Sequence, residues 1–369
     1  MRIPGADLAA QHAALRDELN TALMRVIDSG SFVLGGEVTA FEHEFAGFCE
    51  VEHALGVANG TDALELAVKA LHLNADDAVA LPAFTFAATA EAVCLAGARP
   101  VLVDIDPATF NLDPAALRRT LRTQPGIRAV IVVHLYGRPA PMDEINDIAA
   151  ESGIKVIEDA AQAHGARYRD RPVGGLGRIG CFSFYPTKNL GAAGDAGAVT
   201  TTDVGLAARL AMLRDHGQRE KYLHTIVGHN SRLDALQAAV LRVKLPHVAR
   251  WNARRREVAQ LYRSHLDGAR GIVLPGDDEG AVYHLFTIRC SDRDGLSEEL
   301  ARRGIASAIH YPRTLAQQRA FAFLRHEAGD FPYAEAAARE VLSLPCYPEI
   351  SDEAVREVAA AVKEWASSH

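Results

Sequence analysis

The sequence predicts an α/β protein, with a large domain built on a mostly parallel sheet of about seven strands and a small C-terminal α+β domain. Short, nearly continuous apolar runs alternate with helical stretches over residues 54–201. Such strands with helical crossovers are typical of a parallel sheet covered on both faces. After residue 202 the alternation gives way to long helices and a few strands. The large domain is therefore expected to cover residues 1–246, and the small domain residues 247–369.

Composition excludes several classes of protein. Of the 369 residues, 49% are hydrophobic and 23% are charged, which is ordinary for a globular protein. The formal net charge of −8 argues against a dedicated nucleic-acid binder. Five scattered cysteines without a CxxC pair favour neither a disulfide framework nor a metal centre. No apolar signal core opens the chain, so the cytoplasm is the expected location.

The chain begins with elements that carry no obvious chemistry. An amphipathic helix is expected over residues 9–28, a glycine-containing loop over 29–36 and a second helix over 38–49. A short strand near residues 54–58 then runs into the turn at Asn59 and Gly60, and a helix follows to about residue 71. The free N–H groups of such a helix N-terminus can bind a phosphate. Alternatively, Asn59 or Thr61 is an ordinary N-cap.

Further strands are expected at residues 78–81, 100–104, 129–134, 155–158, 179–183 and 198–201. The longest apolar stretch, residues 78–98, contains Pro82 and Glu91, so we interpret it as a strand and a helix and expect no membrane span. Phe84 and Phe86 follow one strand, where a ring could stack on a flat cofactor or pack in the core. His134, at another strand end, is expected to be a structural, hydrogen-bonded histidine.

Two carboxylates, Glu158 and Asp159, end the strand at residues 155–158. The carboxyl ends of strands in an open α/β sheet are where ligands usually bind. Pyridoxal phosphate requires an acid at its pyridine nitrogen, which keeps the ring an electron sink, and a lysine at its aldehyde. Asp159 can supply that acid, although a helix N-cap is an alternative role.

The central stretch of the chain is SFYPTKNLGAAGDAG, residues 183–197, which places Lys188 in a glycine-rich turn after an apolar strand. Glycine lets backbone or ligand approach closely, and a desolvated lysine loses proton affinity. A lysine tuned in this way can hold an aldehyde as a Schiff base. The alternative is a plain loop lysine beside a turn.

The rest of the chain predicts a polar loop over residues 213–224, a helix from 234 to about 246 and a basic helix over 251–266. The small domain is expected to contain strands at 283–290 and 306–310, helices at 295–303 and 333–342, and a final helix after 351. Its one cluster with the character of a site is His310-Tyr311-Pro312.

Five motifs together resemble the StrS/DegT-type nucleotide-sugar aminotransferases, a branch of the fold type I pyridoxal-phosphate enzymes. They are NGTDAL at residues 59–64, PAFTF at 82–86, EDAAQAHG at 158–165, SFYPTKNLG at 183–191 and NSRLD at 230–234. The resemblance covers nearly the whole chain, and five linked motifs in the family's order are far more specific than any one alone.

The resemblance implies a role for each matching residue. Lys188 would bind the cofactor aldehyde and later shuttle a proton, and Asp159 would contact the pyridine nitrogen. Gln162 would contact the ring hydroxyl, and Phe86 would stack on the ring. The phosphate cup would comprise Gly60, Thr61, Asp62 and Ser183. Asn230 would reach the phosphate of a neighbouring subunit, which implies a homodimer with shared active sites.

The sequence at residues 217–234 and 310–312 is similar to the subgroup that aminates carbon 3 of dTDP-linked 3-keto-6-deoxyhexoses. This implies an amino-acid donor, L-glutamate, and a nucleotide-sugar acceptor, with Arg219, Tyr222, His310 and Tyr311 as substrate contacts. Family members with histidine at the lysine position are dehydratases, and this chain keeps Lys188. The alternatives are an aminotransferase for a 4-keto sugar or a cyclitol, a pyridoxal-phosphate-dependent sugar dehydratase, and a non-enzymatic regulator.

Overall fold

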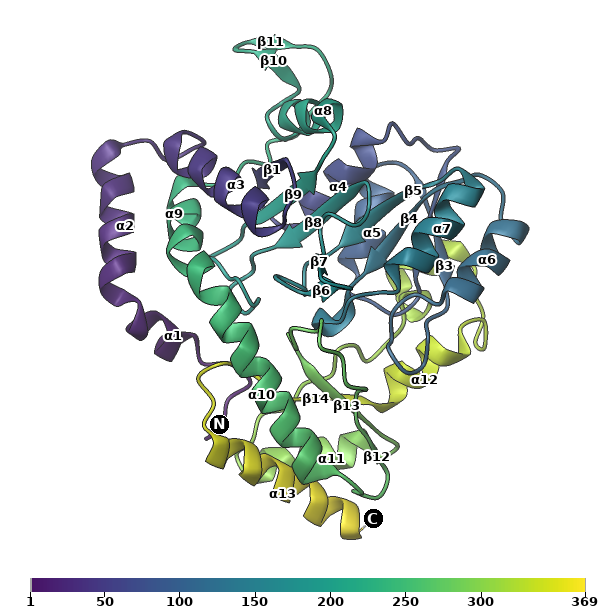
Figure 1. Ribbon diagram of the computed structural model, residues 1–369. Helices are drawn as coiled ribbons and strands as arrows, with labels where there is room; N and C mark the ends of the chain where they lie inside the picture. Colours follow the sequence, from purple (N-terminus) through teal and green to yellow (C-terminus); the bar gives the residue numbers. More distant parts are fainter. Residues whose placement is uncertain (1, 369) are drawn as a thin grey trace.

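The computed structural model, which describes residues 2–368, is built around one seven-stranded sheet (Figure 1). The strand order is β1-β9-β8-β5-β4-β2-β3. Their bounds are β1 (His53–Val57), β2 (Ala78–Pro82), β3 (Arg99–Val103), β4 (Ile127–Val133), β5 (Lys155–Asp159), β8 (Ile179–Ser183) and β9 (Gly197–Thr201). Five strands pair in parallel from β3 to β8, and only β9 runs against them. The predicted sheet is therefore confirmed.

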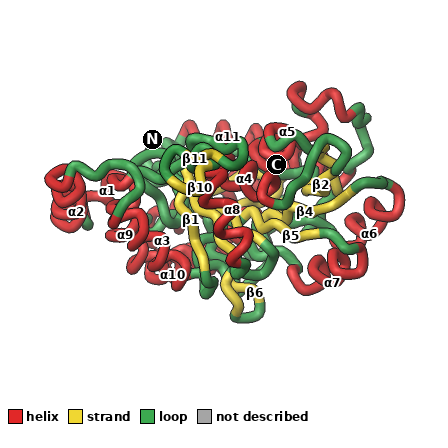
Figure 2. The backbone as a smooth tube through the Cα atoms, turned by 90° about the horizontal axis from the view of Figure 1, so that it is seen from above, coloured by secondary structure: helices red, strands yellow, loops and turns green. Residues whose placement is uncertain are grey.

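Helices cover both faces of this sheet (Figure 2). On one face lie α4 (Gly60–Ala70), α5 (Ala88–Leu95) and α8 (Val204–Arg214). On the other lie α6 (Pro114–Thr123) and α7 (Met142–Ser152), with α3 (Gly36–Phe48) and α9 (Ala235–Lys244) beside them. Alternate residues of β2 serve the two cores, since Val79 packs with α4 and α5 while Ala80 packs with α6 and α7. Both faces are apolar, which explains the continuous apolar runs.

The N-terminal segment forms two helices rather than the single predicted one. They are α1 (Leu8–Ala14) and α2 (Arg16–Ser29). The helix breaks at Leu15, whose φ of −113° departs from helical values and whose side chain is buried. The bend lets Leu15 join the core beneath α3 and α9.

The small domain carries α10 (Val248–Leu266), α11 (Arg293–Arg302), α13 (Asp352–Ser368) and a three-stranded sheet, β12-β13-β14. The strands are β12 (Ile272–Val273), β13 (Phe286–Cys290) and β14 (Val341–Leu344). Two predictions here were wrong. Residues 306–310 form only one bridge, between Ala308 and Ser343. The predicted helix over 333–342 ends earlier, as α12 (Pro332–Glu340), because the apolar run after it is buried as β14 and pairs with β13.

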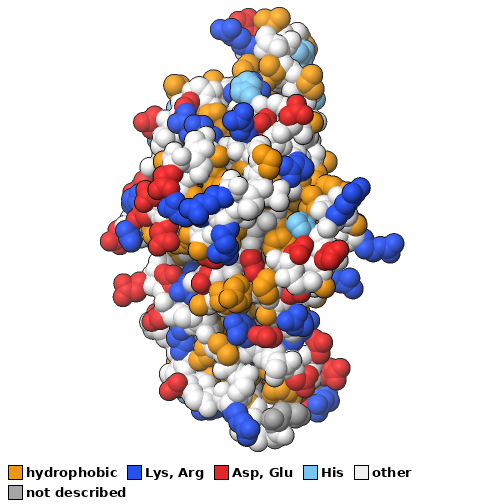
Figure 3. Space-filling view, turned by 90° about the vertical axis from the view of Figure 1, so that its right-hand side faces the viewer, with side chains coloured by type: hydrophobic (Ala, Val, Ile, Leu, Met, Phe, Trp, Pro, Cys, Tyr) orange, Lys and Arg blue, Asp and Glu red, His pale blue; other side chains and the backbone are white. Residues whose placement is uncertain are grey.

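Short elements complete the chain. The segment predicted as a polar loop forms a hairpin of β10 (Gln218–Glu220) and β11 (Leu223–His224), which projects from the top of the molecule in Figures 1 and 3. A second small hairpin pairs β6 (Arg167–Tyr168) with β7 (Arg171–Pro172). The 3-10 helices are η1 (Leu135–Gly137), η2 (Leu245–His247), η3 (Leu315–Gln317) and η4 (Arg319–Leu324). Among residues 2–368, no helix is both long and apolar enough to cross a bilayer.

The division into two domains at residues 246 and 247 stays a proposal. It falls within η2, just before α10. Segments cross it in both directions, because Ile3 packs in the hydrophobic cluster of the small domain, whereas Leu315 and Phe331 pack in the core of the large one. These crossings attach the small domain to the edge of the sheet at which strands β2, β4, β5 and β8 end.

Candidate active site

A cavity of about 650 Å³ opens where these parallel strands end. Strand β1 is antiparallel to β9 and so ends at the same edge, which brings the N-terminus of α4 into the cavity wall. The small domain closes the opposite side with His284, Leu285, His310 and Tyr311. This is the edge at which ligands of open α/β sheets bind. The predicted residues that line the cavity are Gly60, Thr61, Asp62, Phe86, Asp159, Gln162, Ser183, Lys188, His310 and Tyr311.

Lys188 lies in the turn after β8, and its side chain is exposed only in part. Burial lowers the pKa of Lys188 to about 8, although the charge of Asp159 opposes that shift. Its Nζ atom forms no hydrogen bond with residues 2–368. A free amine with a pKa near neutrality is suited to nucleophilic and proton-transfer chemistry.

Asp159 is the last residue of β5 and is buried. Its Oδ2 accepts a hydrogen bond of 2.9 Å from the Thr89 hydroxyl, and its Oδ1 accepts one of 3.2 Å from the Ala161 N–H. Burial raises the pKa of Asp159, while these donors and the Lys188 charge oppose the rise. A buried carboxylate held between two donors can receive a cationic partner from the cavity.

Gln162 is fixed by neighbours on both sides of the domain junction. Its Oε1 accepts the Tyr136 N–H at 2.7 Å, and its Nε2 donates to the Tyr311 hydroxyl at 3.0 Å. The Tyr136 hydroxyl in turn donates to the backbone carbonyl of His310. Burial raises the pKa of Tyr311, so this hydroxyl stays protonated at neutral pH.

The N-terminus of α4 presents free backbone donors. Asn59 caps the helix by accepting the Asp62 N–H at 2.8 Å, which leaves the N–H groups of Gly60 and Thr61 without a partner among residues 2–368. A Cβ atom at Gly60 would lie 2.5 Å from the Cβ of Ser183, so only glycine permits this approach. The helix end can therefore bind an anion beside Ser183. The cap alternative for Asn59 also holds, because a residue can cap the helix while the remaining donors stay free.

The predictions for Phe84, Phe86 and His134 can also be compared with the structure. Phe86 is 55% exposed and lies 5.7 Å from the Tyr311 ring, centroid to centroid, so it is available at the cavity wall. Phe84 is fully buried and belongs to the core. His134 is structural, as predicted: its Nδ1 accepts the Ala140 N–H at 3.0 Å, so its Nε2 donates to Glu158, also at 3.0 Å.

Three predicted residues do not line the cavity of their own chain. Arg219 lies in β10, Tyr222 is 82% exposed at the hairpin turn, and Asn230 is exposed at a bridge to Asp215. The sequence reasoning also missed cavity residues, of which Thr89, Tyr185 and His284 are the chief ones. His284 carried no local motif that could have revealed it, because the domain junction places it there.

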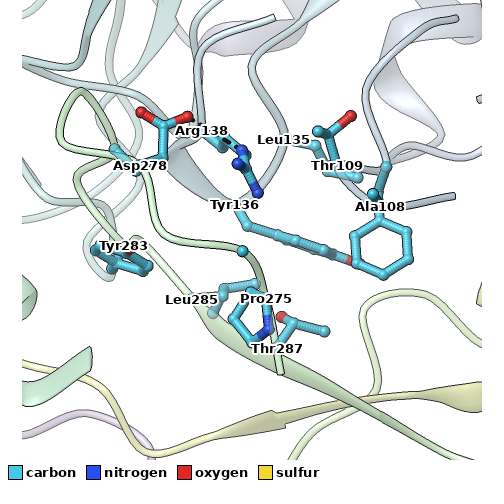
Figure 4. Close-up of a pocket in the computed structure, with 13 residues that line it drawn as sticks. Ala108, Thr109, Leu135, Tyr136, Arg138, Pro275, Asp278, Tyr283, Leu285 and Thr287 are labelled. Carbon is cyan, nitrogen blue, oxygen red and sulfur yellow. Dashed lines mark hydrogen bonds and ion pairs between the residues drawn. The ribbon is translucent and has the colours of Figure 1, made fainter. Parts of the chain in front are cut away.

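A second pocket, beside the first, has a volume of only about 30 Å³, the space of one water molecule (Figure 4). It is too small for a substrate. On one side, Arg138 of the large domain forms an ion pair of 3.1 Å with Asp278 of the small domain. Leu285 lines both pockets.

Comparison with known proteins agrees with this geometry. Residues 13–363 match the model of the DegT/DnrJ/EryC1/StrS aminotransferase family. The chain is 46% identical over 367 residues to dTDP-3-amino-3,4,6-trideoxy-alpha-D-glucose transaminase of Streptomyces venezuelae, covering 99% of this chain and 96% of that one. It is similar to the crystal structure of S. venezuelae DesV in complex with a ketimine intermediate, with a TM-score of 0.96 and 46% identity over 99% and 98% of the two chains. NtdA of Bacillus subtilis, solved with bound PMP, gives a TM-score of 0.87 and 31% identity over 94% and 82%.

Proposed function

The chain belongs to the DegT/DnrJ/EryC1/StrS aminotransferase family, and from this premise we propose the reaction that it catalyses. It transfers an amino group from L-glutamate to carbon 3 of a dTDP-linked 3-keto-6-deoxyhexose. Its cofactor is pyridoxal 5′-phosphate, in keeping with the family and with the PMP-bound relative. A relative 46% identical to this chain is named for a dTDP-3-amino sugar, which supports the choice of nucleotide and carbon.

The observation that carries the proposal is the placement of complementary groups in one cavity. Lys188, whose amine has no hydrogen-bond partner among the described residues 2–368, and Asp159, a buried carboxylate, both line it. The free N–H groups of α4 lie in the same wall, where a Cβ atom at residue 60 would not fit. An amine for an aldehyde, an acid for a pyridine nitrogen and an anion site for a phosphate are the groups that pyridoxal phosphate requires.

When bound, the cofactor supplies an aldehyde that carries the amino group and a ring that accepts electrons. Lys188 would hold the aldehyde, Asp159 the ring nitrogen and Gln162 the ring hydroxyl, with Phe86 against the ring. Gly60, Thr61, Asp62 and Ser183 would surround the phosphate. The Lys188 Nζ, once free, moves a proton at the substrate carbon that loses or gains the amino group. Its pKa of about 8 makes it a competent base near neutral pH.

Turnover with defined substrates tests the proposal. The purified enzyme is incubated with pyridoxal phosphate, L-glutamate and a dTDP-3-keto-6-deoxyhexose, and 2-oxoglutarate and the sugar product are measured. We expect equimolar 2-oxoglutarate and a dTDP-amino sugar with nitrogen at carbon 3. A product aminated at carbon 4, an aminocyclitol from a cyclitol ketone, or a deoxygenated sugar without amino transfer would contradict the proposal and favour the corresponding alternative.

The assembly proposed for the enzyme is a homodimer with shared active sites. The β10–β11 hairpin projects from the body of the molecule (Figure 1). It exposes the side chains of Tyr222 and Leu223, and Val227 just after it is exposed as well. In such a dimer the hairpin would reach into the partner's cavity, which would cover this apolar surface. It would also bring Asn230, Arg219 and Tyr222 to the ligands there. Light scattering should then give twice the mass of 39.7 kDa. A monomer would contradict this assembly.

The proposed location is the cytoplasm, with no membrane or nucleic-acid partner. All five cysteines are free thiols, which fits a reducing compartment. On the face shown in Figure 3, basic and acidic side chains are interspersed, without the continuous basic surface that binds nucleic acid. A gel-shift assay with DNA should therefore show no complex at physiological salt.

A further inference from the structure

Thr89, the second residue of α5, belongs to the cavity wall although no sequence motif revealed it. Its side chain is buried, and its hydroxyl donates a hydrogen bond of 2.9 Å to the Oδ2 of Asp159. A threonine inside a helix often turns its hydroxyl back to the carbonyl four residues earlier. The Thr89 hydroxyl instead reaches the end of β5, where it binds the carboxylate that faces the cavity.

The chemistry of the partners determines the direction of this hydrogen bond. An ionised carboxylate can only accept, so the hydroxyl proton of Thr89 lies toward Asp159. The Oγ1 of Thr85, which is also buried, lies 3.3 Å from the Oγ1 of Thr89. Because Thr89 has given its proton to Asp159, the Thr85 hydroxyl is the donor in this second bond. Two buried hydroxyls therefore form a chain of hydrogen bonds that ends on the carboxylate.

Thr89 also contacts the residue expected to stack on the cofactor ring. Its backbone N–H donates to the carbonyl of Phe86 at 3.3 Å. Thr89 is thus hydrogen-bonded to Phe86 through its backbone and to Asp159 through its side chain. A flat ring can lie against Phe86 and meet the Asp159 carboxylate at its edge only if these two groups keep a fixed relation. Thr89 supplies a direct connection between them.

Asp159 is buried, and a buried carboxyl tends to be neutral. Burial raises the pKa of Asp159, and among the groups that oppose this rise the Thr89 hydroxyl has the largest effect, ahead of the Ala161 N–H and Lys188. Three other titratable groups interact with the carboxylate, from the end of β4, from β8 and from the small domain: His134, Cys181 and Tyr311. Loss of the Thr89 hydroxyl should therefore favour the protonated form of Asp159.

We propose that Thr89 is the positioning residue of Asp159: its hydroxyl keeps the carboxylate ionised and oriented, so that its remaining acceptor positions face the cavity. An ionised carboxylate has about four such positions, and Thr89 and the Ala161 N–H occupy one on each oxygen. This inference rests on the proposed function, because it assigns Thr89 to the acid that would contact the cofactor ring. Thr85 supports Thr89 through its own hydroxyl, and no covalent step is involved.

Binding of pyridoxamine 5′-phosphate to the cofactor-free protein tests the inference without turnover. This form of the cofactor has an amine in place of the aldehyde, so it forms no bond with Lys188. Its affinity should fall when Asp159 takes up a proton, because the neutral carboxyl no longer attracts a cationic ring nitrogen. Dissociation constants are measured by titration calorimetry from acid to mildly alkaline pH. The ionisations of the ligand are common to all variants, so differences between variants belong to the protein.

The decisive variants are Thr89→Val, which keeps the shape of the side chain without its hydroxyl, and Thr89→Ser, which keeps the hydroxyl. Relative to the wild type, the dissociation constant of Thr89→Val should rise about tenfold at acid pH, because losing one hydrogen bond to a charged group raises the Asp159 pKa by about one unit. The two proteins should converge at alkaline pH, where Asp159 is ionised in both. Thr89→Ser should follow the wild type. If Thr89→Val does not fold, Thr89→Ala should show the same loss at acid pH.

Thr201→Val is the matched control. The Thr201 side chain is also buried, but its hydroxyl donates to the carbonyl of Arg178 at 3.0 Å. It ends β9, whereas Gly197 at the start of that strand pairs with Ser183 in the cavity wall, so Thr201 lies at the opposite edge of the sheet. Its loss should leave the binding of pyridoxamine 5′-phosphate unchanged at every pH.

Each outcome decides a specific point. No loss of affinity in Thr89→Val, or an equal loss at every pH, overturns the inference. A Thr89→Ser variant that behaves like Thr89→Val also overturns it, because the hydroxyl would then not be the group that matters. Unchanged binding with a raised KM for the sugar overturns it as well, and would assign Thr89 to the substrate. If the wild-type protein binds no pyridoxamine 5′-phosphate at any pH, the proposed function fails instead, so the two failures are distinguishable.

Discussion

Lys188 and Lys244 both have a lowered pKa, but their surroundings and hydrogen bonds differ. Burial lowers the pKa of both Lys188 and Lys244 to about 8. Lys244 ends α9 and is fully buried, where its Nζ donates to the Gly191 carbonyl at 2.9 Å and lies 2.9 Å from the Nε2 of His12. Lys188 lines a cavity of about 650 Å³ and has no hydrogen bond with residues 2–368.

The contrast shows that a depressed lysine pKa does not by itself identify a reactive group. The Nζ of Lys244 is hydrogen-bonded, and these bonds connect α9 to α1 and to the turn that contains Lys188. Lys188 makes no hydrogen bond with its Nζ among residues 2–368, and it shares its cavity with the Asp159 carboxylate and the N-terminus of α4. A lysine is therefore suited to reaction when its amine lines a cavity and is not already hydrogen-bonded, whereas burial alone only lowers its pKa.

The largest effect expected from this comparison is on turnover. Lys188→Ala should reduce transamination by about 10²–10⁴-fold or more, because both the cofactor link and the proton-transfer group are lost. Lys155→Ala is the matched control, since Lys155 is exposed at the start of β5, away from the cavity, and its loss should leave turnover unchanged. Steady-state assays with 2-oxoglutarate detection measure both. Appreciable residual activity in Lys188→Ala would contradict the proposed role of Lys188 in cofactor binding and proton transfer.

Asp159→Asn should have the next largest effect. It keeps the size of the side chain but removes the charge, so turnover should fall about 10–100-fold, as expected for the loss of a charged hydrogen bond. Because the Asp159 charge raises the pKa of Lys188, its removal should also shift the pH profile of cofactor capture downward. Normal turnover would leave Asp159 as no more than a local acceptor for the Ala161 N–H.

Lys188 matters more for turnover, but replacing Lys244 should cost more stability than replacing Lys188. Lys244→Met leaves the buried Gly191 carbonyl without its donor, whereas Lys188→Met breaks no hydrogen bond. The Lys244 variant should thus be less stable than the Lys188 variant by about 1–3 kcal/mol in urea unfolding of the cofactor-free proteins. Equal stabilities would show that the Lys244 contacts contribute little.

The pH dependence of stability should also distinguish Lys188 from a lysine that titrates normally. Lys188 has a pKa of about 8 in the folded protein, whereas a lysine in the unfolded chain has its ordinary pKa of 10.5. Between these values the unfolded chain binds the extra proton, so the Lys188 contribution to wild-type stability rises with pH. The free energy of unfolding of Lys188→Met should therefore exceed that of the wild type most at pH 7. This difference in stability should narrow toward pH 10. A gap independent of pH would mean that Lys188 titrates normally.

The sequence predicted the half of the site that is carried by local motifs. The apolar strands are continuous because the sheet is covered on both faces, and they place Asp159 at the end of β5 and Lys188 in the turn after β8. The other half depends on how the small domain returns to the sheet edge. There β14 replaced the end of a predicted helix, since Val341 and Leu342 prefer burial beside β13, and His284 entered the cavity from a stretch without a motif. Long-range packing of this kind leaves no periodic signal in one sequence.

The most direct test of the central claim is to locate the lysine that binds the cofactor. The wild-type protein is loaded with pyridoxal 5′-phosphate, reduced with borohydride to a stable secondary amine, digested, and mapped by mass spectrometry across its six lysines. We predict one adduct, on Lys188, and none on Lys244 despite its equal pKa shift. An adduct on Lys244 or another lysine, with Lys188 unmodified, would contradict the account.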